Sequence, residues 1–298
     1  MNLQSHDFRA MASPCEVVIA GAEPAQALQA ACAAEAEVRR IELKYSRFRP
    51  DSVIGRINAG AHAGPVTVDD ETLALLHYAG RLHALSDGLF DITTGALQGA
   101  WDFKAGRIPG DAELAALLPH VGWHHVRIEG RALRLADPLA RVDLGGFGKE
   151  YAADRAAAVL QAQGVASGYV NLGGDIRVVG PRPDGSPWQI GIRHPRDPGK
   201  LLASIPVASG GLATSGDYER FFEKDGQRYC HVLSPRDGRP VTRWQSVSVL
   251  APEAITAGTA CTVAMLKQDE ALAFLRASTL AFLAVDADGV IHTHHTKE

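Results

Sequence analysis

The sequence predicts an α+β fold in which largely antiparallel sheets pack against helices. Helix and strand patterns are interspersed without the regular alternation of a doubly wound parallel sheet, and several strand patterns are joined by short turns typical of hairpins. Neither a low-complexity linker nor an internal repeat interrupts the 298 residues. We therefore expect a single domain over residues 1–298, with room for two lobes.

The first half of the chain predicts strands at both ends and helices between them. CEVVIA at 15–20 is short and β-branched, whereas residues 25–46 are rich in strong helix formers and nearly free of Gly and Pro. A second helix pattern runs from about 70 to 86. Alternating apolar residues over 124–136 predict a β-hairpin, and RVDL at 141–144 predicts a further strand.

The second half opens with a helix pattern over 149–164, which ends in a glycine. SGYVNLGGDIRVVGP at 167–181 predicts two strands around a Gly-Gly turn. Further short strands are punctuated by Gly and Pro between 188 and 252. A helix pattern over 257–277 and two short strands over 281–292 close the chain.

The charge balance and the cysteine pattern exclude several kinds of partner and site. Thirty Lys and Arg against 34 Asp and Glu give a net charge of −4, so no broad positive field is available for a nucleic acid. The four cysteines form no CxxC pair. This pattern argues against both a disulfide framework and a cysteine zinc site.

The N-terminal segment shows neither the pattern of a signal peptide nor a lipobox. No window of the sequence approaches the ~20 apolar residues of a spanning helix. We therefore expect no membrane insertion. The sequence as it stands predicts a cytoplasmic protein, or a periplasmic one if a precursor segment was removed.

A glycine-rich segment between a strand and a helix, DLGGFGK at 143–149, is the most informative local pattern. Backbone N–H groups and the positive end of a helix can bind phosphate oxygens there, and Lys149 adds a positive charge. The segment fits neither the P-loop nor the GxGxxG pattern. From the glycines alone, an anion site and a tight strand-to-helix turn are equally good interpretations.

Other polar patterns are weaker on their own. NLGGD at 171–175 is explained by turn chemistry as well as by ligand contact, and TSGDY at 214–218 gathers hydroxyls beside a carboxylate. His231 lies at the end of a strand pattern, where a packed histidine is commoner than a catalytic one. None of these patterns identifies a function alone.

Seven segments, taken in order, resemble the ApbE family, the FAD:protein FMN transferases. They are FRAMASPCEV, KYSRFRPDSVIGRIN, DGLFDITTGAL, VDLGGFGKEYAADRA, YVNLGGDIRVVG, ATSGDYERFFEKDGQRYCHVLSPRDGRPV and SVSVLAPEAITAGTACT, and they span Phe8 to about Leu266. The resemblance implies an ApbE-like, T-fold-like architecture with a flavin cleft. It also implies transfer of FMN from FAD to a Ser or Thr hydroxyl of a target flavoprotein, with a phosphoester formed and AMP released.

Position by position, the resemblance implies one residue for proton transfer and several that contact FAD. His231 matches a histidine that assists proton transfer. The implied FAD contacts are Met11, which packs on the flavin, Phe48, which stacks on the cofactor, Gly95, Ala96 and Leu97, which contact FAD through their backbone, and Lys149, Arg155 and Leu233.

At the implied Mg2+ site the sequence departs from the family. The resemblance implies a backbone oxygen of Ala152 and the hydroxyl of Thr262 as metal ligands. Gly258 stands where the family has Asp, and Ser234 replaces the acid of an HxxDP motif. Because Mg2+ prefers carboxylate and phosphate oxygens, these replacements predict weak metal binding. Gly258→Asp is then expected to restore metal dependence.

Three functions stay open at this point. The retained flavin segments favour an active FMN transferase. The missing acids at Gly258 and Ser234 favour a FAD-binding protein with little or no transferase activity, such as a carrier, a sensor or a partner. FAD hydrolysis to FMN and AMP differs from transfer only in whether water or a protein hydroxyl attacks the phosphorus. The sequence does not separate these two reactions.

Overall fold

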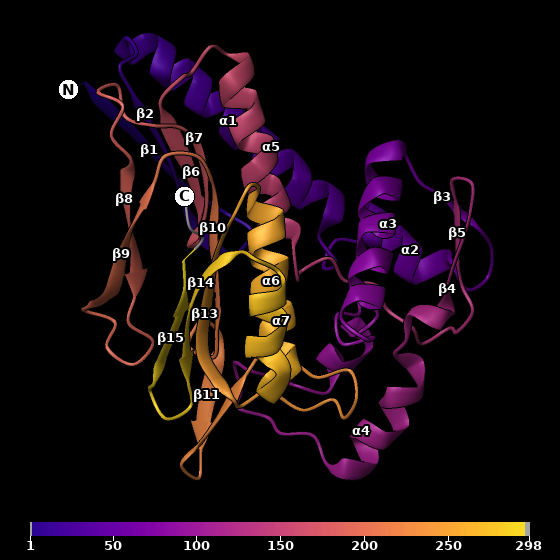
Figure 1. Ribbon diagram of the computed structural model, residues 1–298. Helices are drawn as coiled ribbons and strands as arrows, with labels where there is room; N and C mark the ends of the chain where they lie inside the picture. The colour runs from indigo at the N-terminus through magenta and orange to yellow at the C-terminus, as the bar shows by residue number, and fades with distance from the viewer. Residues whose placement is uncertain (1, 296–298) are drawn as a thin grey trace.

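The computed structural model describes residues 2–295. Within them, an eight-stranded antiparallel sheet has the strand order β1-β2-β6-β7-β10-β13-β14-β15 (Figure 1). Its strands are β1 (Leu3–Ala10), β2 (Ser13–Ala20), β6 (Gly168–Leu172), β7 (Asp175–Gly180), β10 (Gly210–Gly216), β13 (Trp244–Ala251), β14 (Ala281–Asp286) and β15 (Ile291–His294). The predicted class, a largely antiparallel sheet packed with helices, is confirmed.

The sheet is buried on both faces, as β2 shows. Val17 and Ile19 pack into one core cluster with the helices, whereas Val18 and Ala20 belong to a second cluster on the opposite face. The hairpin of β8 (Trp188–Arg193) and β9 (Leu201–Val207) covers this second face (Figure 1). Burial on both faces explains why this strand reads as a continuous apolar run.

Helices form a layer on the first face of the sheet (Figure 1). They are α1 (Pro24–Tyr45), α5 (Gly148–Ala162), α6 (Ala254–Lys267) and α7 (Ala271–Ala277). The buried faces of α1 and α5 are rich in alanine, which lets the two helices pack closely. Among residues 2–295, no helix combines the length and the apolar character needed to cross a membrane.

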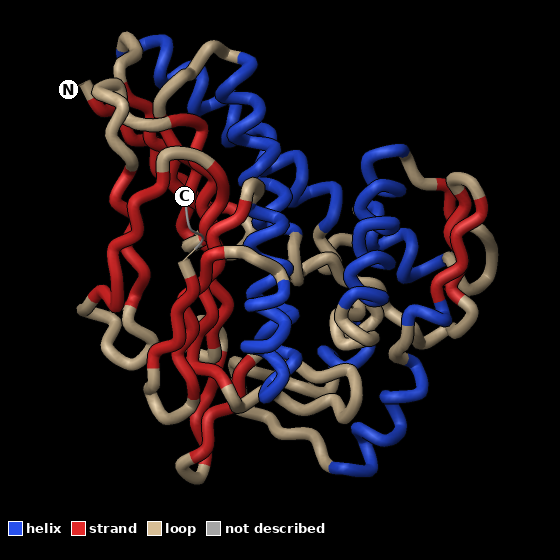
Figure 2. Tube along the Cα trace, in the orientation of Figure 1, coloured by secondary structure: helices blue, strands red, loops and turns tan. Residues whose placement is uncertain are grey.

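A second group of elements lies beside the helical layer, on the side away from the sheet (Figures 1 and 2). It contains α2 (Val53–Gly60), α3 (Asp70–Leu85), α4 (Asp111–Leu117) and a small sheet of β3 (Val66–Thr67), β5 (Ala132–Leu135) and β4 (Val126–Glu129). A separate hairpin joins β11 (Phe221–Lys224) to β12 (Gln227–Cys230). The helix expected near 70–86 and the hairpin expected within 124–136 are confirmed.

One expected strand does not form, and one strand of the structure was not expected. The strand expected at 141–144 does not form, because Val142 donates its N–H to Asn58 Oδ1 and Asp143 donates its N–H to Ile92 O, which leaves one isolated bridge at Arg141. The edge strand β1 was not predicted, because its residues are mostly exposed or half-buried and polar.

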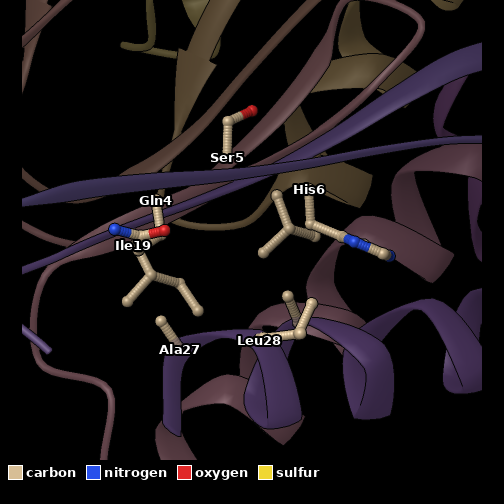
Figure 3. A pocket seen from close by; sticks show the side chains of 8 residues that line it. Gln4, Ser5, His6, Ile19, Ala27 and Leu28 are labelled. Carbon is tan, nitrogen blue, oxygen red and sulfur yellow. The ribbon is translucent and has the colours of Figure 1, made fainter. Parts of the chain in front are cut away.

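Figure 3 shows a small pocket between the β1–β2 hairpin and α1. Gln4, His6, Ile19 and Leu28 are among the residues that line it, and its volume is about 30 Å³. That volume is roughly one water's share of the liquid, so the pocket is too small for a nucleotide. Gln4 pairs with Ile19 toward the open end of the hairpin, away from the turn after Ala10.

Candidate active site

Two tight hairpin turns meet at one end of the sheet. The β1–β2 turn has positive φ angles of 52° at Met11 and 59° at Ala12, and the β6–β7 turn has positive φ angles at Gly173 and Gly174. Gly173 donates its N–H to Pro14 O, and a Cβ on Gly173 would lie only 2.8 Å from the Cβ of Ser13. Left-handed backbone costs non-glycine residues free energy, so Met11 occupies a strained position of the kind that concentrates at ligand sites.

Lys149 lies beside these turns. Its Nζ donates to Asp175 Oδ2 at 2.7 Å, and a Cβ on Gly173 would lie 3.9 Å from the same Nζ. Desolvation lowers the pKa of Lys149, but the charges of Asp175 and Glu150 outweigh it and raise the pKa above its ordinary value. Lys149 is therefore a fixed cation whose side chain is still 31% exposed.

The N-terminal end of α5 carries Lys149 and has no side-chain cap. Phe147 at the N-cap makes no side-chain hydrogen bond to the helix, and a Cβ on Gly148 would meet nothing within 4 Å. Gly145 donates its N–H to Asp143 Oδ1, and a Cβ on Gly146 would press on Phe90 at 3.0 Å. The loop is a tight turn, and the helix that follows it has an N-terminus without a side-chain cap. Both interpretations, the structural turn and the anion site, therefore stay open.

Glu150, the next residue of α5, points into the protein toward Gly258 of α6. A Cβ on Gly258 would lie 2.3 Å from Glu150 Oε1. Glu150 is only 6% exposed, and its Oε2 is buried with no hydrogen-bond partner. Burial, followed by the charge of Asp175, raises the pKa of this carboxyl.

The expectation that Gly258→Asp would restore metal dependence stays a prediction, and the side chain of Glu150 would have to move to admit the new residue. The space over Gly258 already contains the carboxylate of Glu150, so an Asp side chain at position 258 would collide with it. The sequence has no acid at position 258, but the carboxylate of Glu150 lies beside Gly258 in the structure.

Asp154 fixes the register between α5 and α6. Its two carboxylate oxygens accept the N–H groups of Ala254 and Ile255 at 2.9 Å each, and so cap the first turn of α6. Asp154 follows Glu150 by one turn of α5, as Gly258 follows Ala254 by one turn of α6. The two helices therefore run antiparallel, and the cap places Glu150 over Gly258.

The expected metal ligands lie on the same two helices. Thr262 follows Gly258 by one turn, and its Oγ1 lies 3.2 Å from Ser215 Oγ on β10. Ala152 is fully buried within α5. The thiol of Cys261 points elsewhere, because it donates to Ala213 O at 3.3 Å. Metal binding by Ala152 and Thr262 stays a prediction.

His231 follows β12 in a loop, and the residue as a whole is exposed. Its N–H donates to Arg220 O at 3.0 Å. Desolvation makes the largest contribution to lowering the pKa of the imidazole. The positive charges of Arg220 and Lys149 lower this pKa further. The ring is therefore neutral at pH 7 and close enough to Lys149 to respond to its charge.

The other implied FAD contacts lie near these groups or near the Gly-rich loop. Ala96, Leu97 and Leu233 belong to one apolar cluster, and a Cβ on Gly95 would lie 2.5 Å from Arg141 O. Arg47 stacks over the ring of Phe48, which is 79% exposed. Two further contacts converge on the loop, because Arg47 and Gln98 both approach Asp143 Oδ2.

Arg155 is placed apart from Lys149. Its Nε donates to Glu37 Oε1 of α1 at 3.2 Å, on a different face of α5. With Arg40, Glu71 and Tyr151, these two residues line a surface pocket of about 450 Å³. A role for Arg155 in FAD binding stays a prediction.

Sequence reasoning missed Glu150 and Asp154 and treated Asp175 only as part of a turn. Spacing gave one available signal, since Glu150 and Asp154 lie four residues apart and share a face of α5. Among residues 2–295, no group of three or more His, Cys, Asp or Glu side chains is arranged to hold a metal ion. A cation here would need hydroxyl, carbonyl or phosphate oxygens in addition to a carboxylate.

Comparison with known proteins identifies the family of the chain. The model of the ApbE family matches residues 11–284. A FAD:protein FMN transferase of Vibrio cholerae is 35% identical over 249 residues, which cover 81% of this chain and 75% of that protein. One from Klebsiella pneumoniae is 31% identical over 261 residues, covering 84% and 75%.

Solved structures are similar over the whole chain. A crystal structure of the ApbE protein from Thermotoga maritima has a TM-score of 0.92 at 29% identity and covers 100% of both chains. The flavin transferase ApbE from Vibrio cholerae has a TM-score of 0.85 at 29% identity, covering 98% of this chain and 96% of that one.

Proposed function

Because the chain belongs to the ApbE family, we propose that it is a FAD:protein FMN transferase, which moves FMN from FAD to a Ser or Thr hydroxyl of a target flavoprotein. The observation that supports this most strongly is Lys149, a fixed cation at the open N-terminal end of α5 between two hairpin turns. A pyrophosphate needs such a combination of a positive charge and free N–H groups.

In this proposal the chain is one domain with two lobes, and FAD binds across them. Lys149, oriented by Asp175, holds the pyrophosphate oxygens. Met11 lies against the flavin from the β1–β2 turn, and Gly95 and Leu233 contribute to the flavin side from the other lobe. Phe48, exposed beside Arg47, is available to stack on the cofactor.

The reaction joins the acceptor hydroxyl oxygen to the phosphorus of the FMN half. The bond from that phosphorus to the bridging oxygen breaks, and AMP leaves with this oxygen and its electron pair. His231 receives the hydroxyl proton, because its lowered pKa keeps the ring neutral at pH 7. A divalent cation held with the help of Thr262 and the Ala152 carbonyl would neutralise charge on the pyrophosphate.

The test is incubation with FAD, Mg2+ and a flavoprotein domain that carries an acceptor Thr, followed by mass spectrometry. We expect covalent FMN on the wild-type acceptor, none on a Thr→Ala acceptor, and AMP in equal amount. We expect His231→Gln to slow transfer by about 10²- to 10⁴-fold. FAD bound without any covalent flavin would support the binding protein, and free FMN with AMP would support the hydrolase.

A further inference from the structure

We propose that Glu150 provides the carboxylate that binds a divalent cation in this protein, reaching from α5 into the space over Gly258 of α6. The proposal rests on the proposed function, because the phosphate oxygens of FAD would supply the rest of the coordination. It assigns a ligand role to a residue outside the set implied by the sequence.

The environment of the Glu150 carboxylate favours a bound cation. Glu150 is 94% buried, and its Oε2 has no hydrogen-bond partner. A buried polar atom without a partner costs free energy, and an ionised carboxylate costs more than a neutral group. A cation beside Oε2 would remove this cost.

The nearest positive charge, that of Lys149, is paired with another carboxylate. Lys149 precedes Glu150, but its Nζ donates to Asp175 Oδ2 at 2.7 Å. Asp175 is itself buried, at 3% exposure. Lys149 and Asp175 therefore form one pair, and the carboxylate of Glu150 is left for a further positive charge.

The side chain of Glu150 occupies the space over Gly258. Any side chain at 258 would begin 2.3 Å from Glu150 Oε1, so the absence of a side chain there makes room for the carboxylate. Asp154, which caps α6, holds the two helices in this register. The carboxylate beside Gly258 is that of Glu150, and it comes from α5.

Neighbouring donors suit a hard cation. Thr262 lies one turn beyond Gly258, and its hydroxyl is 3.2 Å from that of Ser215. The soft ligand nearby, Cys261, is directed to Ala213 O. Carboxylate and hydroxyl oxygens together with phosphate oxygens form a typical ligand set for Mg2+ or Mn2+.

The experiment measures Mn2+ binding by electron paramagnetic resonance, with the protein saturated with FAD and no acceptor present. We expect Glu150→Gln to weaken Mn2+ binding by on the order of 10- to 100-fold. Glu37→Gln, which changes a carboxylate of α1 that pairs with Arg155 on another face of α5, should leave Mn2+ affinity unchanged. Circular dichroism confirms that each variant is folded.

The paired exchange keeps the test valid if a single variant is unstable. Gly258→Asp combined with Glu150→Gly moves the carboxylate from α5 to α6 and should retain Mn2+ binding. Equal Mn2+ affinity of wild type and Glu150→Gln overturns the proposal, as does a wild type that binds FAD without Mn2+. Because no acceptor is present, these outcomes are distinguishable from a failure of FMN transfer.

Discussion

Two faces of α5 contact acidic groups in opposite states, Glu71 of α3 on one face and Glu150 of α5 itself on the other. Toward α1 and α3, Glu71 accepts from Arg40, Lys44 and Tyr151 at 2.5 to 2.9 Å. Toward α6, one oxygen of Glu150 has no partner. The donors, with Arg40 first, lower the pKa of Glu71, whereas burial raises the pKa of Glu150.

The contrast separates an acid that stabilises the fold from one that is available to a ligand. Paired carboxylates connect α1, α3 and α5 and are satisfied without any additional group. Oε2 of Glu150 has no hydrogen-bond partner within the described residues, so its burial costs stability unless a proton or a cation is bound. The variants below test this difference from both sides.

Gly258→Asp should have the largest effect on stability. It puts a second acid where Glu150 already lies, with overpacking and a further buried charge, and should lower the free energy of unfolding by about 3 kcal/mol. Urea denaturation measures this loss. In the Glu150→Gly background the same substitution should recover most of it, and a single variant as stable as wild type would contradict the steric argument.

Lys149→Met should weaken FAD binding by roughly 10- to 100-fold, because a charge-assisted hydrogen bond to the pyrophosphate is lost. Quenching of flavin fluorescence on binding gives the affinity. Arg155→Met, on the face that pairs with Glu37, should have a smaller effect. Equal losses would show that both faces contact FAD and would remove the distinction between them.

Glu71→Gln should lower the free energy of unfolding by about 1–3 kcal/mol and leave FAD affinity unchanged. The lowered pKa of Glu71 also gives this effect a pH dependence. The stabilisation is fully present above the unfolded-state pKa of about 4.3 and is lost as the pH falls below it. Denaturation at pH 7 and pH 3 should show the gap between wild type and variant narrowing, and a gap that widens in acid would refute the pairing.

The sequence predicts much of the fold because several helices and strands have a local composition that is typical of their type. Residues 24–45 have the composition of a helix, and the apolar run before Gly21 matches a strand buried on both faces. The edge strand β1 escaped notice because its residues are mostly polar and partly exposed. The missing strand at 141–144 depended on a side chain 84 residues away, Asn58, which takes over a backbone hydrogen bond.

The candidate site divides in the same way. Lys149 and the Gly-rich loop are visible as a short pattern, and the resemblance supplied His231 and Thr262. The relation of Glu150 to Gly258 was not predictable, because it depends on how α5 and α6 align through Asp154. A missing acid is readable from one sequence, whereas its replacement from another helix requires the packed structure.

The most direct test of the cation site is a crystal structure with FAD and Mn2+, in which anomalous scattering locates the metal. The account predicts a peak between α5 and α6, at about 2 Å from a carboxylate oxygen of Glu150 and close to Thr262. An ordered FAD with the Mn2+ peak away from Glu150 would contradict it.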